Sequence, residues 1–265
     1  MRRPAAGAGG GPWFGAAGAL CGALVALLVF APAAWLGDAV ARASAGRFLL
    51  ADARGSLWSG SALPVLAGGP DSLEARALPS RLQWTLGLDG FALALRARQP
   101  CCIHGELALR VAPAWGGLKI SLPAAQGSYG QWPAAWLDGL GTPFNTLRLG
   151  GWLSLSGEGL VVESAAGRWR LAGQALLRVD DLSARVSGDE KLGSYRLALS
   201  GGSVARIALS TLDGPLELTG NGQWGPGGLR FRGLARAAPG YEAGLNNLLN
   251  LLGRRQGAAA VLSIG

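Results

Sequence analysis

The residues that could do chemistry are few. The sequence holds one histidine, His104, and it lies close to the adjacent cysteines Cys101 and Cys102. Three ligands within four residues cannot close a tetrahedral metal site, and no second histidine or cysteine pair stands elsewhere. A histidine-based triad would need a nucleophile, and no Gly-x-Ser-x-Gly elbow supplies one. The sequence therefore predicts neither a metal site nor a nucleophilic active site.

Two other patterns could suggest catalysis or cofactor binding. Residues 220–225 (GNGQWG) match the spacing G-x-G-x-x-G, but Pro226-Gly227-Gly228 follows and predicts a turn where the dinucleotide fingerprint needs the start of a helix. The acidic pairs Asp180-Asp181 and Asp189-Glu190 lie in predicted turns, where a solvated surface is the usual explanation. We expect no cofactor and no enzymatic activity.

Composition limits the fold and the partners. Glycine (44 of 265 residues) counts against a mostly helical protein, while 49 % apolar residues and ten tryptophans count against disorder. The 24 basic residues outnumber the 16 acidic ones, but only Lys119 and Lys191 are lysines, and neither follows a phosphate-binding glycine loop. The arginines alternate with apolar residues and form no cationic run, so nucleic-acid binding is not expected.

An apolar segment near the N-terminus predicts a membrane anchor. Residues 14–36 (FGAAGALCGALVALLVFAPAAWL) carry no charge, and as a helix they would reach about 34 Å, enough for a hydrocarbon core of about 30 Å. Because Arg2 and Arg3 precede this segment, the tail is expected to stay in the cytoplasm and the rest to be exported. The residues expected to form the membrane anchor are Phe14, Leu20, Leu24, Leu27, Leu28, Phe30 and Trp35.

A cleaved signal peptide is the alternative interpretation of this segment. Ala31-Pro32-Ala33 offers small residues for cleavage, but Pro32 is poorly placed and the apolar run exceeds the usual core of about 7 to 15 residues. We therefore expect an uncleaved anchor. In an oxidising compartment, Cys101 and Cys102 could form a vicinal disulfide or pair with another chain, and two partly buried thiols without function remain an alternative.

Beyond the anchor, the dominant period of the sequence is two. Alternation of apolar and polar residues predicts half-buried antiparallel strands, and Gly-rich turn signals separate them. The alternating runs are residues 81–88, 91–96, 106–111, 147–156, 168–177, 182–186, 195–199, 204–209, 216–220 and 229–235. The fold class expected is mainly β, a curved antiparallel meander of half-barrel type behind a transmembrane helix.

Two stretches depart from this alternation. Residues 132–140 place Trp132, Trp136 and Leu140 on one helical stripe, and residues 241–252 place Leu245, Leu248, Leu249 and Leu252 on one helical face. We expect two short helices that cover the core, the second capping an end of the sheet. The domains expected are a cytoplasmic tail (1–13), a transmembrane helix (14–36), a connecting segment (37–54) and a periplasmic β-rich domain (55–265).

Three groups of residues together resemble one known family. They are residues 55–62 (GSLWSGSA), residues 78–86 (LPSRLQWTL), and the ending formed by 251–257 (LLGRRQG) and 261–265 (VLSIG). In this order after a single apolar segment, they resemble the type II secretion system protein N family, also called general secretion pathway protein N. The signature residues are Gly55, Leu57, Trp58, Gly60, Ala62, Leu82, Trp84, Leu86, Leu252 and Gly253.

The resemblance implies an accessory inner-membrane protein without enzymatic activity and with its bulk in the periplasm. It would assist the export of folded proteins across the outer membrane, with the inner-membrane platform or the outer-membrane secretin as partners. The residues of the first two motifs favour a structural role, because Trp84 shares one strand face with Leu82 and Leu86, and Gly55 and Gly60 allow a tight turn or a bulge. A partner contact by Trp58 or Trp84 is the alternative.

A second resemblance favours a different function. Residues 214–220 and 228–234 are similar to strand repeats of AsmA-like envelope proteins, whose curved sheets present an apolar groove to lipids. This implies a lipid-binding or lipid-transfer protein as the alternative. The concave face of the sheet should separate the two, because a groove filled by Trp132, Trp136 and the C-terminal helix favours a packed scaffold, and an uncovered leucine lining favours lipid.

Overall fold

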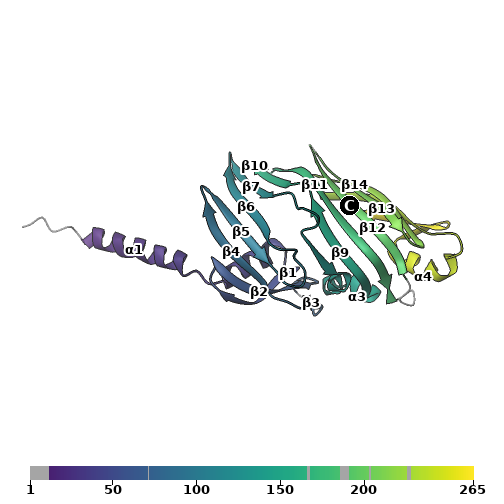
Figure 1. The fold of residues 1–265 in the computed structure, drawn as a ribbon, viewed down its shortest axis with the longest axis horizontal. Coiled ribbons are helices and arrows are strands. Elements are labelled where there is room, and N and C mark those ends of the chain that lie inside the picture. The colour runs from purple at the N-terminus through teal and green to yellow at the C-terminus, as the bar shows by residue number, and fades with distance from the viewer. Residues whose placement is uncertain (1–11, 71, 166–167, 186–190, 203, 226–227) are drawn as a thin grey trace, which may run out of the picture.

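The protein is described by a computed structural model that covers residues 12–70, 72–165, 168–185, 191–202, 204–225 and 228–265. Seventeen strands in these residues form one open antiparallel sheet (Figure 1). The mainly β, antiparallel fold class is therefore confirmed. The predicted tail, residues 1–13, lies largely outside the described residues.

The N-terminal apolar segment forms two helices instead of one. Helix α1 spans Pro12–Val29 and helix α2 spans Ala34–Ala43. Between them Pro32 forms a β-bridge with Ser56, and the amide of Ala33 donates to the carbonyl of Gly55. The prediction of one continuous helix over residues 14–36 is wrong, because Pro32 has no amide to continue the helix and the sheet takes up the backbone beside it.

The expected membrane-anchor residues fall on both sides of this break. Leu20, Leu27 and Leu28 are exposed on α1, Phe30 is exposed just after it, and Trp35 is exposed on α2. The side chains of Phe14 and Leu24 lie outside the described part of the chain. In the residues that the structure describes, no helix combines the length and the apolar character needed to cross a membrane.

The first half of the sheet is an antiparallel meander in which β2 pairs with β1 on one side and with both β3 and β4 on the other, and β4 to β7 pair each with the next. Its first strand lies inside the segment expected to be a connector. The strands are β1 (Phe48–Gly55), β2 (Ser59–Ala67), β3 (Ala75–Ala77), β4 (Leu82–Asp89), β5 (Ala92–Arg98), β6 (Leu107–Ala114) and β7 (Gly117–Leu122).

Interrupted strands join the two halves. Strands β9 (Leu149–Gly157) and β10 (Leu160–Ala165) follow each other along one side of the long strand β11 (Arg168–Ala184). On their other side, β10 pairs with β7 and β9 pairs with the short strand β8 (Gly130–Pro133). The sheet is therefore continuous from the first strand to the last.

The second half continues the meander through β12 (Lys191–Gly202), β13 (Ala205–Asp213), β14 (Leu216–Gly225) and β15 (Gly228–Ala237). Helix α4 (Glu242–Leu252) then crosses over, and β17 (Ala259–Ile264) pairs with β15 on one side and with β16 (Arg254–Gln256) on the other. The predicted helix over residues 241–252 is confirmed.

The other predicted helix, over residues 132–140, is only partly formed. Trp132 belongs to strand β8, opposite Leu153, and a 3₁₀ helix, η1 (Ala134–Leu140), begins after Pro133. A short helix, α3 (Phe144–Leu147), follows. The stripe of Trp132 with Trp136 is therefore wrong, because extended backbone at Trp132 breaks the helical spacing.

Two apolar clusters lie on the sheet. The larger joins β8, β9, β11–β15 and β17 to η1, α3 and α4, with Leu192, Leu216, Leu248 and Leu249 almost fully buried. The smaller lies in the first half, around Ala33, Ala62 and Trp84. Each cluster therefore has its own helical cover.

Candidate functional site

The residues expected to be inert pair with side chains near them. His104 Nδ1 lies 2.9 Å from Ser128 Oγ, and Cys101 and Cys102 form a vicinal disulfide in the turn after β5. Asp180 and Asp181 lie in β11 and not in a turn, and they pair with Arg178 and Lys191. The pair Asp189-Glu190 lies outside the described residues.

Among the described residues, neither the glycine motif nor a set of metal ligands forms a binding site. Residues 220–225 belong to strand β14, so the glycine motif there opens no helix. No group of three or more metal-ligating side chains occurs among the residues that the structure describes.

The first signature motif forms a corner in which Trp84 packs against glycine. Trp84 is 3 % exposed and its Nε1 donates to the carbonyl of Leu57 at 3.1 Å. A Cβ atom on Gly60 would lie 2.5 Å from Trp84 Cζ2, so a side chain has no room there. Gly55 has φ +90°, a conformation that favours glycine. Gly55, Gly60 and Trp84 are therefore spaced so that they pack together at the β1–β2 turn.

The same turn holds the end of α1. Trp58 Nε1 donates to the carbonyl of Leu28 at 2.8 Å, and the amide of Leu57 donates to the carbonyl of Ala31 at 2.7 Å. The carbonyl of Trp58 accepts from the amide of Leu86 in β4. The turn at residues 56–58 therefore links the N-terminal helix to two strands of the sheet, a function that the sequence motif alone does not reveal.

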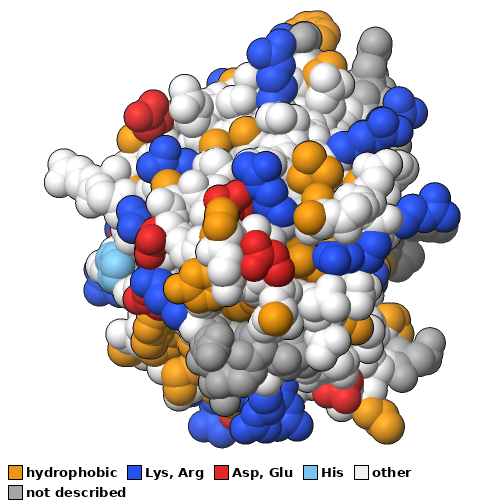
Figure 2. Space-filling model, turned by 90° about the vertical axis from the view of Figure 1, so that its right-hand side faces the viewer, with side chains coloured by type: hydrophobic (Ala, Val, Ile, Leu, Met, Phe, Trp, Pro, Cys, Tyr) orange, Lys and Arg blue, Asp and Glu red, His pale blue; other side chains and the backbone are white. Residues whose placement is uncertain are grey.

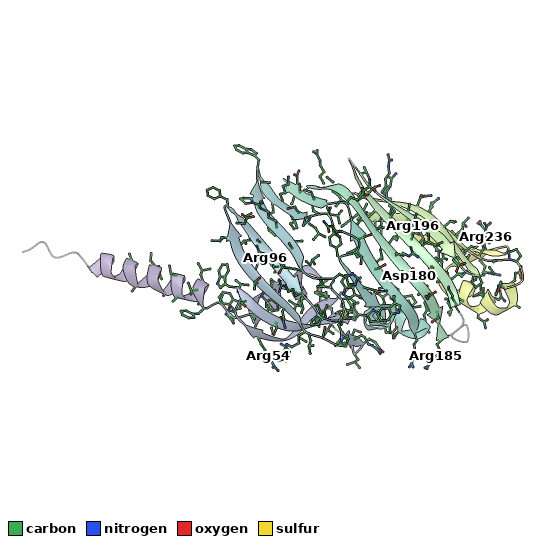
Figure 3. All side chains as sticks on the ribbon, viewed as in Figure 1. Arg54, Arg96, Asp180, Arg185, Arg196 and Arg236 are labelled. Atoms are coloured by element: carbon green, nitrogen blue, oxygen red, sulfur yellow. A yellow bond between two sulfur atoms is a disulfide. The ribbon has the colours of Figure 1, made fainter. Side chains whose placement is uncertain are left out.

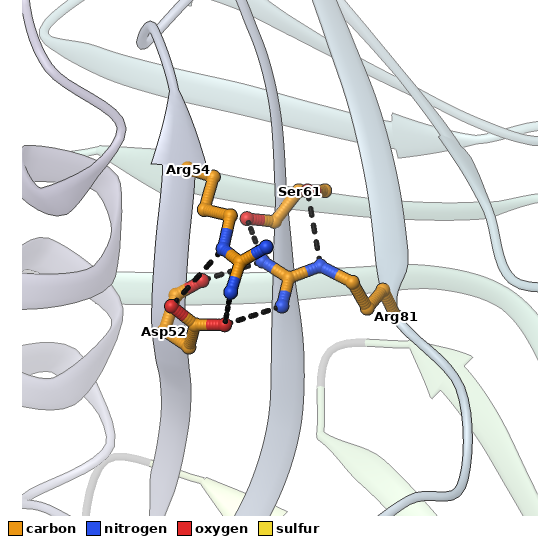
Figure 4. Close-up of polar contacts among 4 residues, drawn as sticks. All are labelled: Asp52, Arg54, Ser61 and Arg81. Carbon is orange, nitrogen blue, oxygen red and sulfur yellow. Dashed lines mark hydrogen bonds and ion pairs between the residues drawn. The ribbon is translucent and has the colours of Figure 1, made fainter.

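The second motif supplies an arginine that spans β2 and holds β1 (Figure 4). Arg81 Nη1 lies 2.7 Å from Asp52 Oδ2, and Arg81 Nη2 donates to the carbonyls of Asp52 and Ser61. Asp52 has φ +49° at an irregularity of the β1 pairing, and Arg54 binds its carboxylate from the other side. Hydrogen bonds from Arg54 and then Arg81 lower the pKa of Asp52. The edge strand is thus kinked and charged, which opposes pairing with another strand.

The C-terminal signature fixes helix α4 to the sheet. Leu252, at the end of α4, packs against the larger cluster. A Cβ atom on Gly253 would collide with the carbonyl of Val261 in β17. The glycine allows the chain to return directly from the helix into the sheet.

The sheet has a charged face and a leucine-rich face. Arg96, Asp180, Arg196 and Arg236 are charged residues on separate strands, as the labelled side chains of Figure 3 show. Three of them have ion-pair partners: Glu106 for Arg96, Arg178 for Asp180 and Glu217 for Arg236. Alternation along each strand sends the leucines to the opposite side.

The leucine-rich face is filled at one end only. In one row across β9, β11 and β12, Leu153, Val179 and Tyr195 lie opposite one another and belong to the larger cluster, to which η1, α3 and α4 contribute. Two rows further along β12 and β13, Leu199 and Ile207 lie opposite each other, half-buried and outside both clusters. The lining is therefore covered beneath the helices and partly open beyond them.

The two tryptophans used above to distinguish a packed scaffold from a lipid groove lie apart. Trp132 packs against the larger cluster. Trp136 instead donates from Nε1 to the carbonyl of Arg76 at 3.0 Å and meets Phe48 edge to face, with ring centroids 6.1 Å apart. Of the three elements whose filling of the groove would favour a packed scaffold, Trp136 therefore lies elsewhere, because the 3₁₀ helix turns it toward β1 and β3.

A pocket of about 530 Å³ lies between β3, η1, α3 and the end of β11. Arg76, Arg148 and Arg185 line it together with Asp138, whose buried Oδ1 has no hydrogen-bond partner. Figure 3 shows Arg185 at the lower end of β11. Because basic and acidic groups share this lining, its charge selects no single class of ligand.

Comparison with known proteins gives one match. A family model described as type II secretion system (T2SS), protein N, matches residues 47–262, which include every strand from β1 to β16 in full. No curated protein matches the chain. No solved structure matches it either.

Proposed function

Because the chain belongs to the type II secretion system protein N family, and so to the accessory components of that system, we propose that it acts without catalysis, by protein–protein contact. In this proposal the apolar segment 14–36 anchors the chain in the inner membrane. The β domain stands in the periplasm and assists the export of folded proteins across the outer membrane. The family match over residues 47–262 is the observation that carries the proposal.

The charged face of the sheet is the surface proposed for the protein contact. Arg196 is exposed at its centre, opposite Arg178 on β11 and Ser210 on β13. Charged side chains spread over a continuous sheet can make many directional contacts with a partner protein, and these contacts do not depend on a mobile loop. Other components of the secretion system, the inner-membrane platform or the secretin, are the partners proposed.

Crosslinking in the cell tests this proposal. A photoreactive residue placed at Arg196 should capture a component of the secretion machinery, whereas one placed at Leu248, on the buried face of α4, should capture none. When a reporter enzyme that works only in the periplasm is fused to the C-terminus, it should be active. A reporter active only in the cytoplasm, or unchanged secretion of every substrate after deletion of the gene, would contradict the proposal.

Lipid binding is the second candidate function, and the half-buried rows beyond the helices favour it. Leu199 and Ile207 belong to a leucine-rich lining that the described helices leave partly open. Protein extracted in mild detergent should then carry phospholipid, which mass spectrometry would detect. Replacing Leu199 with arginine should reduce the bound lipid, while the same replacement of exposed Leu251 should not. Extracts free of phospholipid count against this function.

A further inference from the structure

Alternate turns of the meander lie along one side of the sheet, where the strand ends meet. The β4–β5 turn at Gly90 and the β6–β7 turn at Gly116 are on this side, because the four strands are successive antiparallel neighbours. The β1–β2 turn at residues 56–58 is on it too, since Ser59 lies opposite Thr85 and β4 runs on from there toward the β4–β5 turn. The end of α1 is therefore bonded to the same side of the sheet as these hairpin turns.

This side carries large apolar side chains that nothing in the described chain covers. Phe91 is 97 % exposed and Trp115 is 101 % exposed, which makes them the most exposed aromatic residues of the described chain. Leu88 beside them is 77 % exposed, and Trp224 at the β14–β15 hairpin is 55 % exposed. We call the following set the apolar rim: Leu88, Phe91, Trp115, Leu118, Val204, Trp224 and Leu229.

The turns themselves do not require these residues. Gly90 and Gly116 have φ +63° and +77°, so the glycines supply the conformation that each hairpin needs. Phe91 and Trp115 add apolar area that is left in water, at a cost of about 25 cal/mol per Å². Aromatic side chains at such positions are favoured where a protein meets the headgroup region of a bilayer.

The charge beside the rim suits a lipid surface. Arg206 and Arg230 lie on either side of Gln223, one position from Trp224, and both are exposed. No ion pair within the described residues neutralises these two arginines. Figure 2 shows hydrophobic and basic side chains next to each other along its upper edge. Cations beside apolar groups match anionic headgroups above acyl chains.

We propose that the apolar rim rests on a phospholipid bilayer, with Phe91 and Trp115 inserted at the level of the headgroups. The bilayer is the one that holds the N-terminal apolar segment, so this inference rests on the anchor in the proposed function. The exposed side chains of Leu27 and Leu28 at the end of α1, and of Phe30 just after it, then continue the same apolar contact from the helix to the turns. The sheet is held against the membrane at several points, and its charged face stays available to protein partners.

Site-specific spin labels in the full chain test this inference. Free Cys21 is replaced by alanine, and single cysteines are introduced as F91C, W115C and, in the β16–β17 turn on the opposite side, A258C. All three positions are exposed, so the fold should survive, which far-ultraviolet circular dichroism checks. Each labelled protein is reconstituted in nanodiscs of phosphatidylethanolamine and phosphatidylglycerol. Collisions with oxygen and with a water-soluble nickel chelate are then measured.

We expect labels at 91 and 115 to lose nickel collisions and gain oxygen collisions on reconstitution, while the label at 258 keeps its collisions with nickel. Labels at 91 and 115 that stay as accessible to nickel as the label at 258 would overturn the inference. Shielding that is already present in lipid-free amphipol would overturn it as well, because protein would then be the cover. Secretion and crosslinking at Arg196 report on the proposed function separately, so either idea can fail alone.

Discussion

Replacing Gly60 with alanine should destabilise the sheet, because the added methyl group would collide with Trp84 and with two backbone carbonyl oxygens. The new Cβ atom would lie 2.5 Å from Trp84 Cζ2, and also 2.8 Å from the carbonyl oxygen of Arg54 and 2.9 Å from that of Ser56. Trp84 cannot move away freely, because it is buried and bonded to the carbonyl of Leu57. Overpacking of this kind costs about 1 to 3 kcal/mol. For a domain of this size the melting temperature should fall by about 2 to 12 °C.

Gly87→Ala is the matched control for this prediction. Gly87 lies in β4 near Trp84, and a Cβ atom there would meet nothing within 4 Å, so its effect should stay within about 0.5 kcal/mol. Thermal unfolding followed by circular dichroism gives both melting temperatures. In a Trp84→Phe background, which removes Cζ2, Gly60→Ala should cost less than it does alone. Equal melting temperatures for Gly60→Ala and Gly87→Ala would refute the reasoning.

Three further outcomes follow from the packing and the charges. Tyr195→Phe should lower the unfolding free energy by about 1 to 3 kcal/mol in urea titrations, because its buried hydroxyl lies within 3.0 Å of two carbonyl oxygens, while Tyr241→Phe, at an exposed ring, should have almost no effect. Leu248→Ala should cost about 2 to 5 kcal/mol in the same assay, against under about 0.5 kcal/mol for exposed Leu251→Ala, and similar values would contradict the role given to α4. Because the pKa of Asp52 is lowered in the folded state, its ionised carboxylate stabilises the fold above the unfolded pKa of about 3.9, and this stability is lost as pH falls through the folded value. Asp52→Asn should therefore weaken the dependence of the melting temperature on acid pH. An unchanged dependence would exclude this contribution.

The strands could be predicted from the sequence because their environment repeats every two residues. Leu153, Leu155, Leu177 and Leu197 all stand at alternate positions, and all fall on the leucine-rich face. Helix α4 could be predicted equally well from the sequence, because Leu245, Leu248 and Leu249 lie on one side at helical spacing and are buried. A pattern that depends on neighbours within one element can be recognised before the fold is known.

The sequence-based predictions were wrong where pairing with residues far away in the chain determines the backbone conformation. Residues 30–33 look like the continuation of an apolar helix, but Pro32 and Ala33 are held by Ser56 and Gly55. Trp132 looks helical beside Trp136, but pairing with β9 extends it. Neither the pairing of β7 with β10 nor the bond from Trp58 to Leu28 has a local signal, because both partners lie far apart in the chain.

The order of strands in the sheet has a consequence for biogenesis. Almost every strand from β1 to β15 pairs with the segment that comes just before it, so few long loops must close before contacts form. A chain that emerges N-terminus first can therefore add hairpins one at a time to the growing sheet. Completion depends on the last segment, because β17 must reach back across α4 to β15. Truncation of the final dozen residues would consequently leave the molecule assembled for most of its length but with β15 unpaired on one side.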